Sequence, residues 1–425
     1  MTAQPGPRRE SSTRVVRLPE SWNRALAGLA ILGGLVAVTG IVVAPERGGA
    51  SVLLGVFYVL GLALAGLLFV ALQNVTSAAW SVGLRRVPEA MALTMSRVAL
   101  LSLAVLLLIP TLYVWSDAER VAADPLLQAK SAWLDPAFFV VRTVVCAGAW
   151  MFFAFRLVVA PRRRQRDGGN GDDSGNGNDG GNGDDRPAGA SGAFLVVFAI
   201  TFSIVSFDWI LSLEPHWFST VFAVYNFAGL FLGGVAVITF LTILLVRMGP
   251  LRGVVGPDHL HDLGKLLISF STFWAYIWFC QYLLIWYTNI PEETSHFIAR
   301  QQGAWGVLFV INLVVNWLLP FVVLLPRSAK RSENVLLAIS GLLILGRWLD
   351  LYLLIEPPFH GADPQLGVWE IFPVLGALAW FALAFFRALG QARVVPVEDR
   401  GFESCHLRRA SSTDSVASGG RHGMP

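Results

Sequence analysis

Charged residues and cysteines are both scarce in this chain of 425 residues. Asp, Glu, Lys and Arg together make up 14% of the sequence, whereas 55% of the residues are hydrophobic and the mean hydropathy is +0.59. This balance excludes an ordinary soluble domain and is typical of a polytopic membrane protein. The net charge of +3 is small, and we expect no nucleic acid among the partners.

The supply of residues that could ligate a redox metal is also poor. The three cysteines (Cys146, Cys280 and Cys405) are scattered and form no CxxC or CxxCH motif, which argues against an iron–sulfur cluster or a c-type haem. All seven histidines lie in loops, tails or the ends of apolar segments, whereas a b-type haem between membrane helices needs axial ligands at depth. We therefore expect no haem or Fe–S cluster in this chain.

Long apolar segments dominate the remainder. A spanning helix needs about 20 predominantly apolar residues, and ten segments meet that length. The sequence therefore predicts an all-α polytopic membrane protein with about ten transmembrane helices. The segments cover approximately residues 22–44, 51–72, 91–115, 137–159, 193–213, 217–246, 266–290, 304–325, 335–355 and 367–388.

The basic residues test this count of helices. Of the 32 Lys and Arg residues, 24 belong to the N-terminal arm with the adjoining Arg24, loops 73–90, 160–192, 247–265 and 326–334, and the C-terminal tail with the adjoining Arg387. The alternate loops carry only Arg47, Arg120, Lys130 and Arg300. Since cytoplasmic loops are enriched in Lys and Arg, both termini are predicted to be cytoplasmic.

The predicted helices fall into two groups separated by a polar linker. Residues 160–192 are rich in Gly, Asn and Asp and offer nothing apolar to bury, so they are predicted to be a disordered cytoplasmic linker. The predicted organisation is an N-terminal arm (1–21), helices 1–4 (22–159), the linker (160–192), helices 5–10 (193–390) and a disordered cytoplasmic tail (391–425).

Three charged residues inside the apolar segments are the first candidates for chemistry. Asp208 lies in the stretch SFDWILSLEPHWFSTVFAVYNF, and Arg347 and Asp350 lie one turn apart in GRWLDLYLLIEP. A charged side chain at the centre of a membrane helix costs about 2.5–3.5 kcal/mol on insertion scales, so each should have a partner or a proton to move. The pattern leaves open whether Arg347 pairs with Asp350 or with Asp208, and whether these groups form a structural salt bridge or a proton relay.

A second set of candidates follows from the segment LLISFSTFWAYIWFCQYLLIWYTNIPEE and from the hinge Glu214-Pro215-His216. A cluster of Trp and Tyr at a helix end is usually an interfacial belt, but a Gln at depth calls for a partner or a ligand. The residues singled out as ligand-binding or proton-path candidates are His216, Gln281, Tyr282, Trp286 and Glu292, together with Arg347; the resemblance described below implies that the ligand is a quinol.

The connection before that segment, GPDHLHDLGK, alternates Asp and His. Ligands this close together in one polar loop seldom form a metal site alone, so a proton entrance or a helix cap with a snorkelling lysine is favoured. The cytoplasmic proton-entrance candidates are Asp258, His259, His261, Asp262 and Lys265.

Several predicted outer loops pair an acidic residue with proline: Asp135-Pro136, Glu214-Pro215, Pro291-Glu292 and Glu356-Pro357. An acidic residue and a proline in the first turn suit the helix dipole and the missing N–H donor. Helix capping is the simplest interpretation of these pairs.

The three stretches quoted above, taken together, resemble the NrfD-like (polysulfide reductase membrane subunit) family, and specifically the ActF-type second membrane subunit of alternative complex III. The resemblance is dense over helices five to nine and looser over helices one to four. It implies two four-helix bundles with peripheral helices, a location in the bacterial inner (cytoplasmic) membrane, and a role in a quinol:cytochrome c oxidoreductase.

That resemblance also implies partners and roles. The expected substrate is a quinol, menaquinol or ubiquinol, and the expected partners are membrane lipid, an outer-face iron–sulfur subunit, c-type cytochrome subunits and a second NrfD-like membrane subunit. Asp208 and Asp350 would then be proton acceptors or relays. Two alternatives remain open: a proton- or ion-coupled transporter, which calls for broken helices near the midplane, and a purely structural membrane anchor.

Overall fold

In the computed structural model, which describes residues 18–163, 185–361 and 363–391, ten helical segments are long and apolar enough to cross a membrane. The all-α, ten-helix prediction is therefore confirmed for the described ranges. The spans are α2 (Glu20–Val43), α3 (Pro45–Thr76), the run from α4 to α6 (Arg86–Leu112), the run that begins with α9 (Pro136–Arg163), α11 (Asp185–Trp209), α12 (Phe222–Met248), α13 (Pro257–Thr288), the run from α15 to α16 (Gly303–Leu324), α17 (Glu333–Ile355) and α19 (Val368–Leu389).

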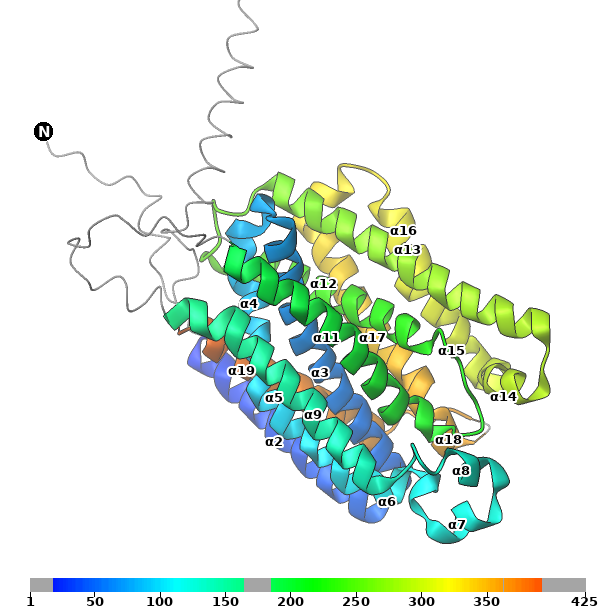
Figure 1. Ribbon diagram of the computed structural model, residues 1–425. Coiled ribbons are helices and arrows are strands. Elements are labelled where there is room, and N and C mark those ends of the chain that lie inside the picture. Colours follow the sequence, from blue (N-terminus) through cyan, green and yellow to red (C-terminus); the bar gives the residue numbers. More distant parts are fainter. Residues whose placement is uncertain (1–17, 164–184, 362, 392–425) are drawn as a thin grey trace, which may run out of the picture.

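The spans pack as two four-helix bundles with a peripheral pair, as the resemblance implied. One bundle consists of α3, α4–α6, α9 and α11, and the other consists of α12, α13, α15–α16 and α17. Contacts between α3 and α12 join the two bundles, and α2 packs with α19 on the outside of α3. Figure 1 shows α2 and α19 together at one edge and α13 with α16 at the opposite edge.

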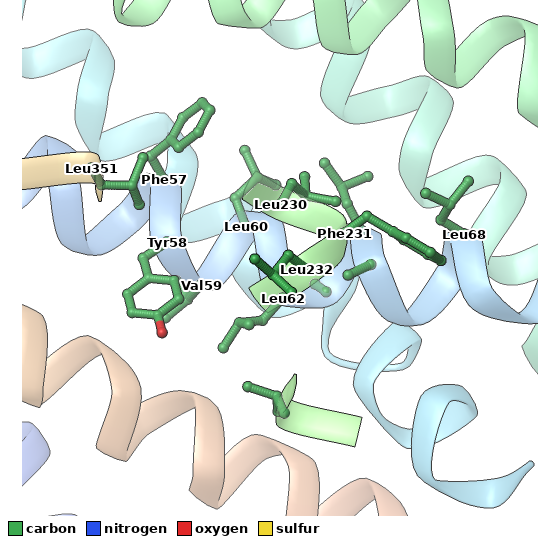
Figure 2. Packing of buried hydrophobic residues seen from close by; sticks show 14 of the residues in the cluster. Phe57, Tyr58, Val59, Leu60, Leu62, Leu68, Leu230, Phe231, Leu232 and Leu351 are labelled. Atoms are coloured by element: carbon green, nitrogen blue, oxygen red, sulfur yellow. The ribbon is translucent and has the colours of Figure 1, made fainter. Parts of the chain in front are cut away.

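The centre of the molecule is α3, because both bundles and the peripheral pair pack on it. In its most apolar window 89% of the residues are buried. Figure 2 shows Phe57, Leu60 and Leu62 of α3 beside Leu230 and Leu232 of α12. An interior helix that is apolar all round is the expected sequence for this position.

Small residues allow the peripheral pair to approach closely. A Cβ at Gly33 of α2 would collide with the backbone of α19 at Phe372 and Gly376. Association of membrane helices depends on such close backbone contact, because lipid tails supply no hydrophobic drive. The glycines at 33 and 376 therefore set the α2–α19 distance.

The short helices α7 (Ala118–Ala123), α8 (Pro125–Lys130), α14 (Pro291–Gln301) and α18 (Pro357–His360) lie at one end of the bundles (Figure 1). We call this the outer end, because the positive-inside rule predicts that it faces away from the cytoplasm. The opposite end, which carries the connections rich in Lys and Arg, is called the basic end.

Some boundaries differ from the sequence prediction. The fourth span continues to Arg163, and α11 begins at Asp185, so both edges of the predicted linker 160–192 are helical. The central part of that linker, most of the predicted arm 1–21 and nearly all of the predicted tail lie outside the described residues. Three spans also contain non-α turns, namely η2 (Leu103–Leu108, 3₁₀) and the π-helices η4 (Phe155–Val159) and η6 (Val314–Leu318).

Candidate functional site

Asp208 of α11 is ion-paired with Arg142 of α9, so its partner comes from the neighbouring helix of the first bundle. Nε of Arg142 lies 2.5 Å from Oδ2 of Asp208, and Nη2 lies 3.1 Å from Oδ1. Both side chains are buried. Of the two pairings that the sequence left open for Arg347, the structure has the one with Asp350. Arg142 was not predicted as the partner of Asp208.

Aromatic groups close this pair on the outer side. The indole N–H of Trp133 donates to Oδ1 of Asp208 at 2.9 Å. The guanidinium carbon of Arg142 lies 4.3 Å from the centre of the Trp133 ring and 4.2 Å from that of Phe138. With both carboxylate oxygens engaged and the cation held against two rings, this pair has the geometry of a static cross-link between α9 and α11.

The second buried pair lies within α17. Nη1 of Arg347 lies 2.5 Å from Oδ2 of Asp350, one turn along the same helix. Nη2 of Arg347 donates to Oδ1 of Asn226 on α12 at 2.6 Å. A Cβ at Gly229 would collide with the Arg347 guanidinium, so α12 accommodates this arginine only because residue 229 is glycine.

A chain of amides and hydroxyls extends from Asp350. The phenol of Tyr225 donates to Oδ1 of Asp350, which also accepts from Nδ2 of Asn312 at 3.3 Å. Nδ2 of Asn316 donates to Oδ1 of Asn312 at 2.7 Å and to the carbonyl of Gly346 at 3.1 Å. Asn316 lies in the π-helix η6, and single π turns often occur at functional sites. Unlike the Arg142–Asp208 pair, this pair belongs to a hydrogen-bonded network.

At the outer end, Glu214 forms a triad with two residues of α14. Oε1 of Glu214 lies 2.7 Å from Nη2 of Arg300, and Oε2 lies 2.5 Å from Nδ1 of His296. The His296 ring stacks on Trp217 at 3.7 Å with an interplanar angle of 7°. Arg300 also donates to the carbonyl of Leu353 at 2.7 Å, so the triad ties α14 to the last turn of α17.

The charges in this triad are balanced. Burial acts to raise the pKa of Glu214, but the neighbouring Arg300 and His296 outweigh it and hold that pKa well below its usual range. Burial and the positive charge of Arg300 lower the pKa of His296 to about 4. At neutral pH the triad therefore consists of an ionised Glu214, a charged Arg300 and a neutral His296.

A second cluster of histidine and carboxylates is buried beside the first turns of α3 and α19. Arg47 donates to Oε1 of Glu370 through Nη2 at 2.7 Å and through Nε at 3.0 Å. Nε2 of His360 lies 3.2 Å from the same oxygen. The hydroxyl of Ser51 donates to Oε1 of Glu356 at 2.9 Å. The cluster thus contains two carboxyl groups, of which Glu370 contacts the arginine.

Glu356 is the carboxyl group that the arginine does not contact. Its Oε2 atom is buried without a hydrogen bond and lies 3.4 Å from Nδ1 of His360. Burial raises the pKa of Glu356 to about 8, and the nearby negative charge of Glu370 adds to the rise. Glu356 therefore holds a proton at neutral pH and can release it to a modest change in its surroundings.

These groups follow one another along the outer half of α17. Arg347 and Asp350 lie one turn apart, the carbonyl of Leu353 accepts from Arg300, and Glu356 follows the last residue of the helix. The rise of an α-helix is 1.5 Å per residue, so the nine steps from Arg347 to Glu356 cover about 14 Å. Buried ionisable groups thus run from the interior of the second bundle to the outer end.

The structure disperses the other quinol-site candidates. His216 is exposed at the outer end and lies 2.6 Å from Oδ2 of Asp124. Trp286 is 65% exposed on α13, and Glu292 is exposed on α14. Gln281 is buried, while Tyr282 is half-buried and stacks on Trp278. In the described part of the chain, no hydrogen bond or ion pair joins any of these five residues to Asp350 or Asp208, and their role stays a prediction.

The proton-entrance candidates lie together at the basic end, where they make local contacts. Arg331 donates to Asp258 at 2.7 Å, and Lys265 lies 2.6 Å from Asp262. Nδ1 of His259 accepts from the backbone N–H of Gly256 at 3.2 Å, which caps α13. His261 is half-buried on the same helix. The helix-cap interpretation is confirmed for His259, and the entrance stays a prediction for the set.

The acid–proline pairs serve different purposes. Asp135 caps α9 by accepting from the N–H of Phe138 at 2.8 Å, as predicted. Glu214 and Glu356 instead belong to the two clusters described above.

Three arginines that pair with these acids were not predicted as their partners: Arg142, Arg300 and Arg47. The sequence did contain a signal for them, because each is an arginine within or beside an apolar segment on the side poor in positive charge. Tyr225, Asn312 and Asn316 carried only the weaker signal of polar groups in apolar segments.

Neither a protein-family model nor a curated protein matches this chain.

Proposed function

We propose that this chain is an integral-membrane subunit of a quinol:cytochrome c oxidoreductase of the NrfD-like, alternative complex III type. Its multi-pass helical character is shown, and the finer assignment depends on the resemblance together with one observation. That observation is the line of buried ionisable groups along the outer half of α17, from the Arg347–Asp350 pair to Glu356. Such groups are rare inside membrane helices and mark proton or substrate paths.

In this proposal the chain handles protons and its partners handle electrons. Oxidation of a quinol releases two protons from its hydroxyl groups and two electrons from its ring. The electrons pass to an iron–sulfur subunit at the outer end and then to c-type cytochrome subunits, while the protons pass to carboxylates of this chain. Both Asp208 and Asp350 pair with an arginine. Asp350 suits a relay better, because Tyr225 and Asn312 also link it to a hydrogen-bonded network, whereas the other side-chain contact of Asp208 is the indole of Trp133.

The test is the turnover of the intact complex that carries Asp350→Asn. Loss of a positioned acid–base group costs on the order of 10²–10⁴ in rate, so quinol-dependent reduction of cytochrome c should fall by about 100-fold. Glu333→Gln, at the exposed basic end of the same helix, is the matched control and should turn over normally. Normal turnover of the Asp350→Asn complex would exclude Asp350 as a proton relay.

A second variant separates chemistry from assembly. Asp350→Asn leaves Arg347 buried without its counter-ion and endangers folding. Tyr225→Phe removes only the hydroxyl that donates to Asp350, so the assembled complex should persist while turnover drops. A Tyr225→Phe complex that assembles and turns over like the wild type would contradict the proposal even if Asp350→Asn cannot be purified.

The transporter alternative keeps one observation in its favour. The π-helix η6 interrupts the eighth span at Asn316, which bonds to the Gly346 carbonyl of α17, and a transporter calls for helix interruptions of this kind. Reconstitution of the chain alone in liposomes with a pH-sensitive dye distinguishes the two functions. Proton uptake without any quinol or partner would favour the transporter.

A further inference from the structure

A pocket at the basic end lies outside every group discussed so far. It has a volume of about 510 Å³ and lies between the start of α2, α5 (Met95–Ser102) and the end of α19. Its polar lining comes from Asn23, Arg97, Trp380 and Arg387, and the remainder is apolar. The pocket is thus a cationic recess among membrane helices.

The two arginines of this pocket lack acidic partners among the described residues. Nη1 of Arg97 reaches only the carbonyl of Ala384, at 3.5 Å, and no ion pair of Arg387 with a described residue is found. Two other arginines at this end, Arg24 and Arg162, are paired with Glu20 and Glu89, respectively. Two guanidinium groups at one recess that have no acidic partner in the described part of the chain favour an anionic ligand, because their planar donor forks match phosphate oxygens.

The surroundings of the pocket favour a lipid over a soluble anion. In the most apolar window of α2 only 11% of the residues are buried. Ile31, Leu35 and Val38 of that helix are more than 60% exposed, and in a bilayer such side chains contact acyl chains. Trp22, in the first turn of α2, is typical of the headgroup level, and Trp380 of α19 lines the pocket. A headgroup in the pocket would therefore have its tails along α2.

We propose that the pocket between α2, α5 and α19 binds the headgroup of an anionic phospholipid, with Arg97 and Arg387 donating to its phosphate. Basic pockets between membrane helices on the cytoplasmic side bind such headgroups, and the positive-inside rule places this end there. The bound lipid would fasten α2 and α19 to the first bundle at α5. The site does not depend on the quinol proposal.

Native mass spectrometry of the delipidated full-length protein, titrated with phosphatidylglycerol, tests the site. Loss of one hydrogen bond to a charged group should weaken binding by about tenfold or more, so Arg97→Gln/Arg387→Gln should weaken the tightest binding event by about 100-fold. Arg387→Gln alone changes an exposed side chain, cannot disturb the core, and should weaken binding by about tenfold. Arg252→Gln, an exposed arginine at the same end, should bind like the wild type.

Two competitors identify the source of the phosphate. Phosphatidylcholine has the same phosphate but no net charge, and should bind the wild type more weakly than phosphatidylglycerol. Inorganic phosphate should fail to displace the bound lipid. Equal binding of the two lipids, displacement by inorganic phosphate, or unchanged phosphatidylglycerol binding in Arg387→Gln and the double variant would each overturn the proposal.

Discussion

Two clusters at the outer end combine histidine, carboxylate and arginine, yet they differ in the protonation of their carboxyl groups at neutral pH. In the triad of Glu214, His296 and Arg300, one carboxylate faces one arginine, and the histidine is neutral at physiological pH. In the cluster of Arg47, Glu356, His360 and Glu370, the only arginine contacts Glu370. Glu356 has no contact with that arginine and lies near Glu370. Burial and the negative charge of Glu370 raise the pKa of Glu356 to about 8.

The ratio of arginines to carboxylates therefore decides what each cluster can do. A buried carboxylate that is matched by a guanidinium stays ionised and acts as a fixed link. A buried carboxylate without one keeps its proton and can exchange it near neutral pH. Asp208 and Asp350 each have a guanidinium partner and differ in their remaining contacts: Trp133 donates to Asp208, whereas Tyr225 and Asn312 link Asp350 to a network of amides and a phenol.

The largest effect is expected from removal of the arginine in the balanced triad. Arg300→Gln leaves Glu214 without its counter-ion and removes the donor to the Leu353 carbonyl. Loss of one partner of a buried pair costs about 3–5 kcal/mol, and the partial exposure of Glu214 (23%) places this pair at the low side of that range. Thermal unfolding in detergent should show the loss. Addition of Glu214→Gln to Arg300→Gln should recover part of it, and a double variant no more stable than Arg300→Gln would contradict the pairing.

Hydropathy was enough to predict the ten spans, because the apolar length of a segment is a local property of the sequence. The ion-pair partner of each buried acid, in contrast, is not a local property of the sequence. Asp208 and Arg142 are 66 residues apart, and Glu214 and Arg300 are 86 apart. Asp135, Glu214 and Glu356 share one local motif, acid followed by proline. Only tertiary packing makes the first a cap and the others members of buried clusters.

A smaller loss of stability should distinguish Glu370 from Glu356 in the cluster that they form with Arg47 and His360. Glu370→Gln removes the charge that pairs with Arg47, and because Arg47 is partly exposed the expected loss is about 1–3 kcal/mol. Glu356→Gln replaces a protonated carboxyl group by an amide of the same shape that still accepts from Ser51, so its loss at neutral pH should stay below about 1 kcal/mol. Urea or thermal unfolding of both variants at one pH measures the difference. Equal losses would mean that Glu356 is ionised as well.

The smallest effect is the pH dependence, and its sign differs between the clusters. The pKa of Glu356 is raised from 4.5 to about 8, so its contribution to stability is present at acid pH and is lost as the pH rises through about 8. The pKa of His296 is lowered from 6.5 to about 4, so its contribution is present above pH 6.5 and is lost as the pH falls toward 4.

Single variants isolate the two contributions. Glu356→Gln should remove the fall in unfolding temperature between pH 4.5 and about 8, and His296→Gln should remove the fall as the pH decreases from 6.5 to about 4. Infrared difference spectra give a direct check, because the carbonyl band of a protonated carboxylic acid should be present at neutral pH in the wild type, disappear as the pH rises through about 8, and be absent from Glu356→Gln at neutral pH. A wild-type protein without that band at neutral pH would place both clusters in the same ionised state and remove the distinction between them.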